Sequence, residues 1–317
     1  KTAGYFTTGE TSHFFFCDHK RYADTCAKVF NTNGQLMDTN ITQGTDEWDN
    51  SEAQDIPGSN HDISGPRIVK KTIDKLHALA SGDKKFAMLV HLFDPHSTYM
   101  EHPGFTYKEH GTASLAEKYD YEIAFEDGLV GQLLDALDAT KLSDNTTVVV
   151  LADHGEGFGL HTIAGQQDFF HGETLYQPVL HVPLMFRVPN AKPCMRDDVV
   201  QLLDLAPTVA ALFDVKPSSK WVGRSLVPAL QCGAMPPEPA FAELMPVKSW
   251  PHEAKSMISA DGSRHVYYRI SDSTWEIYDV DKDPDETNNI VKSDPDATKL
   301  EKQLVEWISQ SLPKGCR

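Results

Sequence analysis

The sequence predicts an α/β fold with a mostly parallel sheet and helices on its faces, followed by a smaller α+β subdomain. The apolar run 146–151 is typical of a strand buried on both faces, and it ends at Asp153-His154-Gly155-Glu156. A long amphipathic segment, 115–139, precedes this strand, which is the order found in βαβ units. From about residue 240 the pattern changes to short alternating segments. We therefore expect two domains, residues 1–239 and 240–317.

The composition is that of an acidic globular protein. The chain has 317 residues, with 29 basic and 46 acidic side chains and a formal net charge of −17. This balance argues against a nucleic-acid partner, since phosphate backbones are bound by basic surfaces. No apolar run approaches the roughly 20 residues of a membrane span, and no signal peptide is visible. An anionic substrate would have to be held by local groups such as a metal ion or histidines.

Elements of the first half follow from periodicity and from turn residues. Gly4 is typical of a helix C-cap and precedes a short strand, so we expect the chain to begin inside a domain. The polar segment 31–66 predicts a long loop. Apolar spacing predicts a helix from Ile63 to Leu79, and Phe86–Phe93 predicts a second buried strand.

Elements of the second half are shorter. Residues 182–188 predict a strand, and 198–213 predict a helix with a kink or break at Pro207. Residues 223–226 predict a turn before a short helix. Alternation over 256–280, with Asp261-Gly262 as a hairpin signal, predicts an antiparallel meander. A helix over 300–308 is expected to close the chain.

Polar side chains follow two of the predicted strands. Asp153 and His154 come directly after one strand, and Asp94 and His96 come after the other. Ligands of open α/β sheets gather at the carboxyl ends of the strands. An adjacent carboxylate and imidazole can share one divalent cation, so Asp153 and His154 are candidate metal ligands. The alternative is a polar strand-to-loop corner, with His96 capping the neighbouring loop.

Further histidines follow in the same region. His154, His161 and His171 lie with Asp153 and Glu156 in a short segment interrupted by glycines and aromatic residues. Such a concentration is typical of metal or anion sites, although a solvated polar loop would have a similar composition. His13 stands just before three consecutive phenylalanines, a pattern more typical of a structural histidine than of a catalytic one.

Five cysteines leave several arrangements open. Cys17 and Cys26 could close a small loop, and Cys194 and Cys232 could close a longer one, which would leave Cys316 free. Five reduced thiols are the alternative.

Several short motifs occur along the chain in a fixed order. They are Ala3-Gly4-Tyr5-Phe6-Thr7, Phe93-Asp94-Pro95-His96 with Tyr99, Asp153-His154-Gly155-Glu156 with Gly159 and His161, His171-Gly172-x-Thr174-Leu175-Tyr176, Asp204 with Pro207-Thr208, Gly223-Arg224-Ser225-Leu226, and Asp283-Pro284-x-Glu286-x-Asn288-Asn289. Together they resemble the sulfatase branch of the alkaline phosphatase superfamily. The resemblance implies a three-layer α/β/α sandwich and hydrolysis of sulfate esters.

The resemblance also implies roles for single residues. Asp153 and His154 would bind a divalent cation, whose identity among Ca, Mn, Mg and Zn stays open. His96 and His171 would be catalytic, binding the anionic oxygens of the ester or protonating the leaving group. His161 and His13 would lie near the substrate, a small-molecule or saccharide anionic ester.

The nucleophile of the family is not found in this sequence. No Cys-x-Pro-x-Arg occurs, and Cys17, Cys26 and Thr7 do not fit that position. We therefore expect a segment upstream of residue 1, and we expect this chain alone to lack hydrolase activity. A phosphodiesterase or phosphoethanolamine transferase of the same superfamily, or a non-catalytic descendant, is the alternative function. Family resemblance further implies a periplasmic or secreted location.

Overall fold

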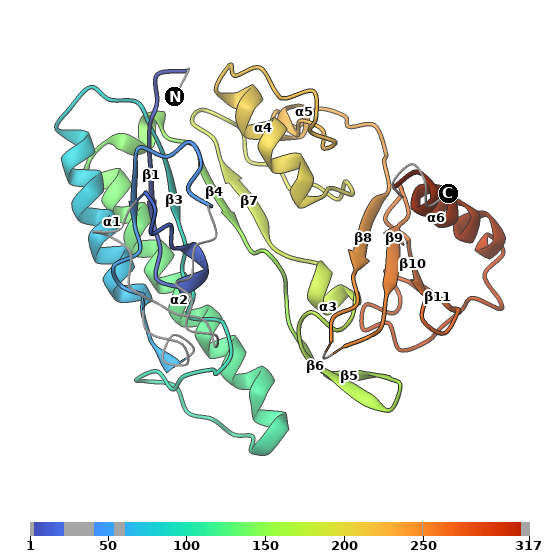
Figure 1. Ribbon diagram of the computed structural model, residues 1–317. Coiled ribbons are helices and arrows are strands. Elements are labelled where there is room, and N and C mark those ends of the chain that lie inside the picture. Colours follow the sequence, from blue (N-terminus) through green and yellow to red (C-terminus); the bar gives the residue numbers. More distant parts are fainter. Residues whose placement is uncertain (1–2, 22–40, 54–60, 249, 312–317) are drawn as a thin grey trace. The chain divides into compact units, whose positions relative to one another are not determined.

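The computed structural model describes residues 3–21, 41–53, 61–248 and 250–311. The chain forms two compact units, Lys1–Thr146 and Thr147–Arg317, and each is described by itself (Figure 1). These units divide the chain at a different place from the expected domains 1–239 and 240–317, and that domain boundary stays a prediction. None of the described helices combines the length and the apolar character needed to cross a membrane.

The first unit contains a parallel sheet in the order β2–β1–β3. Its strands are β1 (Phe6–Glu10), β2 (Glu47–Asp49) and β3 (Phe86–Val90). The strands expected after Gly4 and from Phe86 are confirmed. The burial predicted for the second strand is wrong, since β3 alternates between half-buried and exposed residues. β2 lies within 31–66, for which the sequence predicts only a loop, so that prediction is wrong here. A strand of 3 residues with one buried side chain, Trp48, is too short to show periodicity.

Two long helices pack against each other in this unit (Figure 1). They are α1 (Gly65–Ala80) and α2 (Ser114–Ala139), and both confirm the predicted helices. α1 has a proline in its first turn, where the missing N–H leaves no helical bond unmade. One face of α1 is buried and also contacts β1 and β3; it consists of Ile68, Val69, Thr72, Leu76 and Leu79.

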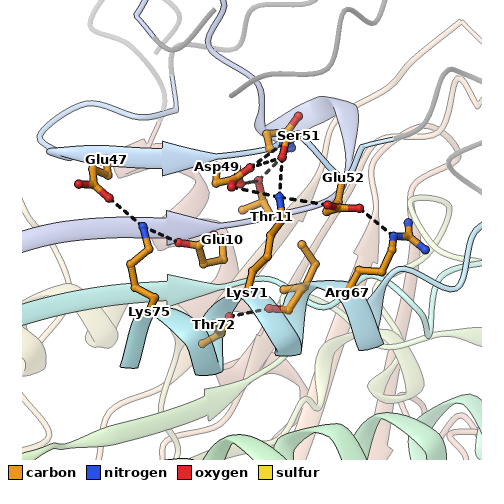
Figure 2. Close-up of polar contacts among 12 residues, drawn as sticks. Glu10, Thr11, Glu47, Asp49, Ser51, Glu52, Arg67, Lys71, Thr72 and Lys75 are labelled. Carbon is orange, nitrogen blue, oxygen red and sulfur yellow. Dashed lines mark hydrogen bonds and ion pairs between the residues drawn. The ribbon is translucent and has the colours of Figure 1, made fainter. Parts of the chain in front are cut away.

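The side of α1 next to this buried face carries a ladder of ion pairs to the sheet, which Figure 2 shows. Three basic side chains spaced four residues apart on α1 reach acids of β1, of β2 and of the residues after β2. The N···O distances are 3.3 Å for Lys75–Glu10, 2.7 Å for Lys75–Glu47, 3.1 Å for Lys71–Asp49, 3.1 Å for Lys71–Glu52 and 2.8 Å for Arg67–Glu52. The ladder therefore fixes α1 to the edge of the sheet.

The second unit is built from shorter elements. They are β4 (Val148–Leu151), β5 (Gly157–Ile163), β6 (Gln166–Phe170), α3 (Gln177–Leu180), β7 (Leu184–Arg187), α4 (Leu205–Leu212), α5 (Val227–Leu230), β8 (Ala240–Leu244), β9 (Ala254–Ile258), β10 (Arg264–Arg269), β11 (Thr274–Asp279) and α6 (Ala297–Ser311).

β4, the strand that leads to Asp153, pairs with β7 in an antiparallel ladder from Val148↔Arg187 to Leu151↔Leu184. Its four residues are partly exposed in the described structure. The prediction of a strand is confirmed, but the prediction of parallel pairing and burial on both faces is not met by this ladder. An apolar run indicates a strand without fixing the direction of its neighbour.

The C-terminal part is an antiparallel sheet, β8–β9–β10–β11, against which α6 packs (Figure 1). Its core is the apolar cluster Met257, Val266, Ile277, Leu300 and Leu304. Gly262 takes a φ of +76° in the turn between β9 and β10, as the Asp-Gly signal predicts. The predicted meander and closing helix are both confirmed.

The helix expected over 198–213 begins only at Leu205, after a 3₁₀ turn at Leu202–Asp204. Pro207 lies in its first turn, where backbone N–H groups have no helical partner, so it does not break the helix. Cys194 and Cys232 form a disulfide with a Cα–Cα distance of 6.1 Å. Cys17 is also disulfide-bonded; Cys26 and Cys316 lie outside the described residues, so the Cys17–Cys26 pairing stays a prediction.

Candidate active site

The loop after β4 turns Asp153 and His154 toward each other. His154 Nδ1 lies 2.9 Å from the carbonyl oxygen of Gly155. Because a carbonyl only accepts, Nδ1 carries the proton, and a neutral ring has its lone pair on Nε2. That Nε2 lies 3.8 Å from Asp153 Oδ1, with the two side chains 37% and 83% exposed. The nitrogen lone pair and the carboxylate thus face a common, accessible point.

The shape of this loop is imposed by α3. Gly155 N donates to the carbonyl of Val179 at 2.8 Å, and Glu156 N donates to that of Pro178 at 3.0 Å. A Cβ on Gly155 would lie 2.1 Å from the Pro178 oxygen, so only glycine fits. The sequence predicts a glycine here for a tight turn; the structural reason is the close approach of a second backbone segment.

His171 pairs with Glu156. The β5–β6 hairpin returns the chain so that His171 Nδ1 lies 3.0 Å from Glu156 Oε1, and the Glu156 side chain is 3% exposed. The hydrogen bond that His171 donates to this carboxylate raises the pKa of His171, and partial burial offsets only part of the effect. The His171 ring also stacks on His154, with centroids 3.9 Å apart. The structure therefore brings Asp153, His154 and His171 together.

His161 lies on β5 and is held from every side by protein groups. Its Nδ1 is 3.0 Å from Asp168 Oδ2, and its Nε2 is 3.0 Å and 3.2 Å from the carbonyls of Asp285 and Glu286. Burial by itself would lower its pKa, but Asp168 and the carbonyls raise it overall. The ring stacks on Tyr176 at 3.6 Å. Since both ring nitrogens are used, the geometry gives His161 a structural role.

His13 and His96 belong to the first unit, where both stack on one aromatic ring. Phe93 stacks on His13 at 3.9 Å and on His96 at 4.5 Å. His96 Nδ1 lies 2.6 Å from the carbonyl of Ser97, which directs its proton to that oxygen. His13 is buried and accepts a hydrogen bond from Phe15 N at its Nδ1. The stack fixes the plane of both imidazoles.

Asp94, which precedes His96, serves the backbone. Its Oδ2 accepts from Gly65 N at 2.8 Å, at the start of α1. Burial raises the pKa of Asp94 to about 6, since it outweighs this hydrogen bond, and the Glu122 charge adds to the increase. Asp94 therefore links the loop that carries His96 to the end of a helix.

Asp153 and His154 fit the requirements of a divalent cation as two of its ligands. A His whose Nδ1 is fixed by a carbonyl and whose Nε2 faces a carboxylate is a common metal-site arrangement. Among the residues that the structure describes, no group of three or more candidate ligand side chains comes together. The described chain thus supplies a partial ligand set.

Sequence reasoning missed the roles of two acids. The sequence groups Glu156 with the candidate metal- or anion-binding residues but does not predict its pairing with His171. Glu286 stands in the predicted turn motif 283–289, but two of its partners, Gln177 and His161, are more than a hundred residues away in sequence, so no local pattern could identify them.

Comparisons with known proteins bear on the family of the chain. The family model described as Sulfatase matches residues 1–215, and the model described as N-sulphoglucosamine sulphohydrolase, C-terminal, matches residues 165–313. Arylsulfatase K of Xenopus laevis is 26% identical over 231 residues, covering 68% of this chain and 41% of that protein. Choline-sulfatase of Rhizobium meliloti is 28% identical over 211 residues, covering 63% and 38%. The chain thus spans about two fifths of the length of these relatives.

Solved structures show the same fold. A phosphonate monoester hydrolase from Silicibacter pomeroyi has a TM-score of 0.66 at 17% identity, with 98% of this chain and 78% of that chain covered. A 2-O GAG sulfatase has a TM-score of 0.64 at 16% identity, with 92% and 73% covered. These likenesses show an alkaline phosphatase-like α/β fold, as predicted. With a family match over more than half its length, the chain belongs to the sulfatase family of the alkaline phosphatase superfamily.

Proposed function

We propose that this chain contributes the metal-binding and proton-donating parts of a metal-dependent hydrolase of sulfate esters. The observation that carries the proposal is the arrangement of Asp153 and His154 beside the His171–Glu156 pair, 3.0 Å apart, in a chain of the sulfatase family. A Lewis acid next to a protonated imidazole is suited to an ester whose negative charge grows on both non-bridging and leaving oxygens.

Asp153 and His154 would hold the cation. When bound, a divalent cation withdraws charge from the non-bridging oxygens of the ester. The Gly155 carbonyl fixes the His154 ring through Nδ1, and Asp153 Oδ1 accepts from His154 N at 3.0 Å, which orients the carboxylate. Both groups are thus set before any ligand binds.

His171 would protonate the leaving oxygen. A general acid should be protonated at the working pH, and Glu156 favours the protonated ring. The same carboxylate holds Nδ1, so the ring has a fixed orientation toward the ester.

His96 belongs to the first unit, and its Nδ1 lies 2.6 Å from the carbonyl oxygen of Ser97. The role expected for His96, binding of anionic ester oxygens, stays a prediction. We propose no substrate contact for His161 or His13. The His161 ring nitrogens bond Asp168 and the Asp285 carbonyl, and the His13 ring stacks on Phe93. We assign no nucleophile to the described residues.

The proposed substrate is a small-molecule or saccharide sulfate. Relatives include a choline-sulfatase and a delta 4,5-hexuronate-2-O-sulfatase, which supports this class without choosing within it. We also propose an extracytoplasmic location, supported by the Cys194–Cys232 disulfide, since such bonds persist in oxidising compartments.

The test is hydrolysis of phenyl and 4-nitrophenyl sulfate, and of 4-nitrophenyl phosphate, by the protein expressed from its complete coding sequence. We expect turnover of the sulfates, with kcat on phenyl sulfate reduced by about 10²–10⁴ in His171→Ala. The reduction should be smaller on 4-nitrophenyl sulfate, whose leaving group needs little protonation.

His77→Ala is the matched control, because His77 is an exposed histidine on α1. Exclusive turnover of the phosphate would favour the phosphoryl-transfer alternative. Absence of turnover of all three esters, in a folded and metal-loaded protein, would support the non-catalytic alternative.

A further inference from the structure

The turn between β11 and α6 is tightly built. Asp283 accepts from Thr287 N at 3.1 Å and from Asn288 N at 2.8 Å through its two carboxylate oxygens. Asn289 Oδ1 accepts from Ile277 N at 3.1 Å, which ties the turn to β11. The turn is therefore a rigid extension of the C-terminal sheet.

Glu286 is the buried residue of this turn. Its backbone has a φ of +53°, a region that non-glycine residues seldom adopt. Its side chain is 0% exposed, with Oε1 2.5 Å from His265 Nδ1 and Oε2 accepting from Gln177 N at 2.7 Å. A strained backbone that buries a carboxylate with both oxygens bonded indicates a specific function for this side chain.

The Gln177 N–H belongs to the first residue of α3, the helix that shapes the metal-ligand loop. α3 is a single turn, and helices of this length are unstable without outside contacts. On one side Glu286 holds its first N–H, and on the other its Val179 and Pro178 carbonyls hold the N–H groups of Gly155 and Glu156. α3 thus connects Glu286 directly to the candidate site.

The same turn also holds the β5–β6 hairpin. The carbonyls of Asp285 and Glu286 lie 3.0 Å and 3.2 Å from His161 Nε2, and His161 in turn bonds Asp168 on β6. This hairpin is the segment that joins Glu156 to His171. Both partners of that pair are therefore fixed, through different elements, by one turn.

We propose that Glu286 is a positioning residue that holds α3 and thereby keeps the 153–156 loop in its ligand-binding shape. Its catalytic consequence rests on the proposed function, whereas its structural effect does not. Without the Glu286 carboxylate, α3 loses its N-terminal anchor, and the Gly155 and Glu156 amides lose a fixed acceptor.

Two variants of the full chain test this. Glu286→Gly deletes the carboxylate with a residue that readily adopts the positive φ. Gln177→Pro keeps Glu286 but deletes the N–H, together with the Gln177 side chain. Proline is well tolerated at the first helical position, and Tyr176 already has the extended backbone that precedes a proline. Asp285→Asn is the control, since it removes one exposed charge from the same turn.

The measurement is amide hydrogen exchange by NMR. We expect exchange of Gly155 and Glu156 to accelerate at least about tenfold in both variants and to stay at the wild-type rate in Asp285→Asn. The Met257 and Val266 amides, in the sheet core, should keep their protection, which separates a local effect from unfolding. Wild-type exchange at Gly155 and Glu156 in Gln177→Pro would overturn the proposal, even if Glu286→Gly fails to fold. Because the readout is independent of turnover, an inactive protein would count against the proposed function alone.

Discussion

Replacing Glu156 with Gln should make His171 lose its proton more easily. Gln keeps the shape and one hydrogen-bond acceptor of Glu but removes the charge. In the wild type the carboxylate lies 3.0 Å from Nδ1 and raises the pKa of His171. In the variant we expect this pKa to fall toward the value of an ordinary histidine, about 6.5.

The size of the effect follows from the distance and the exposure. At 3.0 Å the Coulomb energy is about 1.4 kcal/mol in a water-like medium and about 5.5 kcal/mol at an effective dielectric constant of 20. The His171 side chain is 27% exposed and Glu156 only 3%. We therefore expect a value toward the lower limit, about 2 kcal/mol.

The pH dependence has a definite sign. The folded-state pKa of His171 is raised, so the pair stabilises the protein fully below the unfolded pKa and loses this effect as pH rises through the folded pKa. Glu156→Gln should thus lower the free energy of unfolding by up to about 2 kcal/mol near pH 5.5 and by much less near pH 9.

The assay is NMR titration of the His171 ring, combined with urea unfolding at the two pH values. Glu173→Gln is the matched control, since Glu173 is a nearby acid with no hydrogen bond to His171 in the described structure. An unchanged titration midpoint in Glu156→Gln, or an equal change in Glu173→Gln, would refute the reasoning.

Three further changes test the structure. Lys71→Met should destabilise the first unit by about 1–3 kcal/mol in urea unfolding, because two partly buried acids, Asp49 and Glu52, lose the Lys71 ammonium. Lys70→Met, from an exposed pair, should change the stability by less than about 0.5 kcal/mol. The pKa values of Asp49 and Glu52 are lowered, since hydrogen bonds and the Lys71 charge outweigh burial, so the Lys71→Met effect should disappear as pH falls through those values. Burial raises the pKa of Asp94 to about 6, so the folded wild type holds a proton that the unfolded chain loses near pH 4, and its stability should fall as pH rises from about 4 to 6. Asp94→Asn should abolish this fall; a wild-type pH profile of stability in the variant would contradict the prediction. Leu304→Ala, in the C-terminal core, should lower the free energy of unfolding by about 2–5 kcal/mol, as measured by thermal or urea unfolding. The control Val305→Ala, at the exposed neighbouring position, should lower it by less than about 1 kcal/mol.

The position of Asp153 and His154 at the end of a strand could be predicted from sequence because its signal is local. An apolar run followed at once by Asp153 and His154 places both side chains at one strand end, whichever direction the neighbouring strand takes. The direction itself could not be predicted, since β4 and β7 are joined through the β5–β6 hairpin and α3.

The environment of His171 and His161 could not be predicted in the same way. The β5–β6 hairpin turns at Ala164-Gly165, both with positive φ, and alanine gives no turn signal there. Without that hairpin, Glu156 and His171 are merely two polar residues of one loop. His161 resembled a substrate ligand in its motif, but its acceptors come from Asp285 and Glu286, which only the folded chain brings near.

Paramagnetic broadening by Mn²⁺ in the full chain tests the cation site most directly, since it detects weak as well as tight binding. We expect substoichiometric Mn²⁺ to broaden the ring signals of His154 and His171 first. Asp153→Asn should abolish this broadening, while His77 and His252 stay unaffected throughout. Equal broadening of all four histidines, or broadening at His154 that persists in Asp153→Asn, would contradict the assignment of Asp153 and His154 as a cation site.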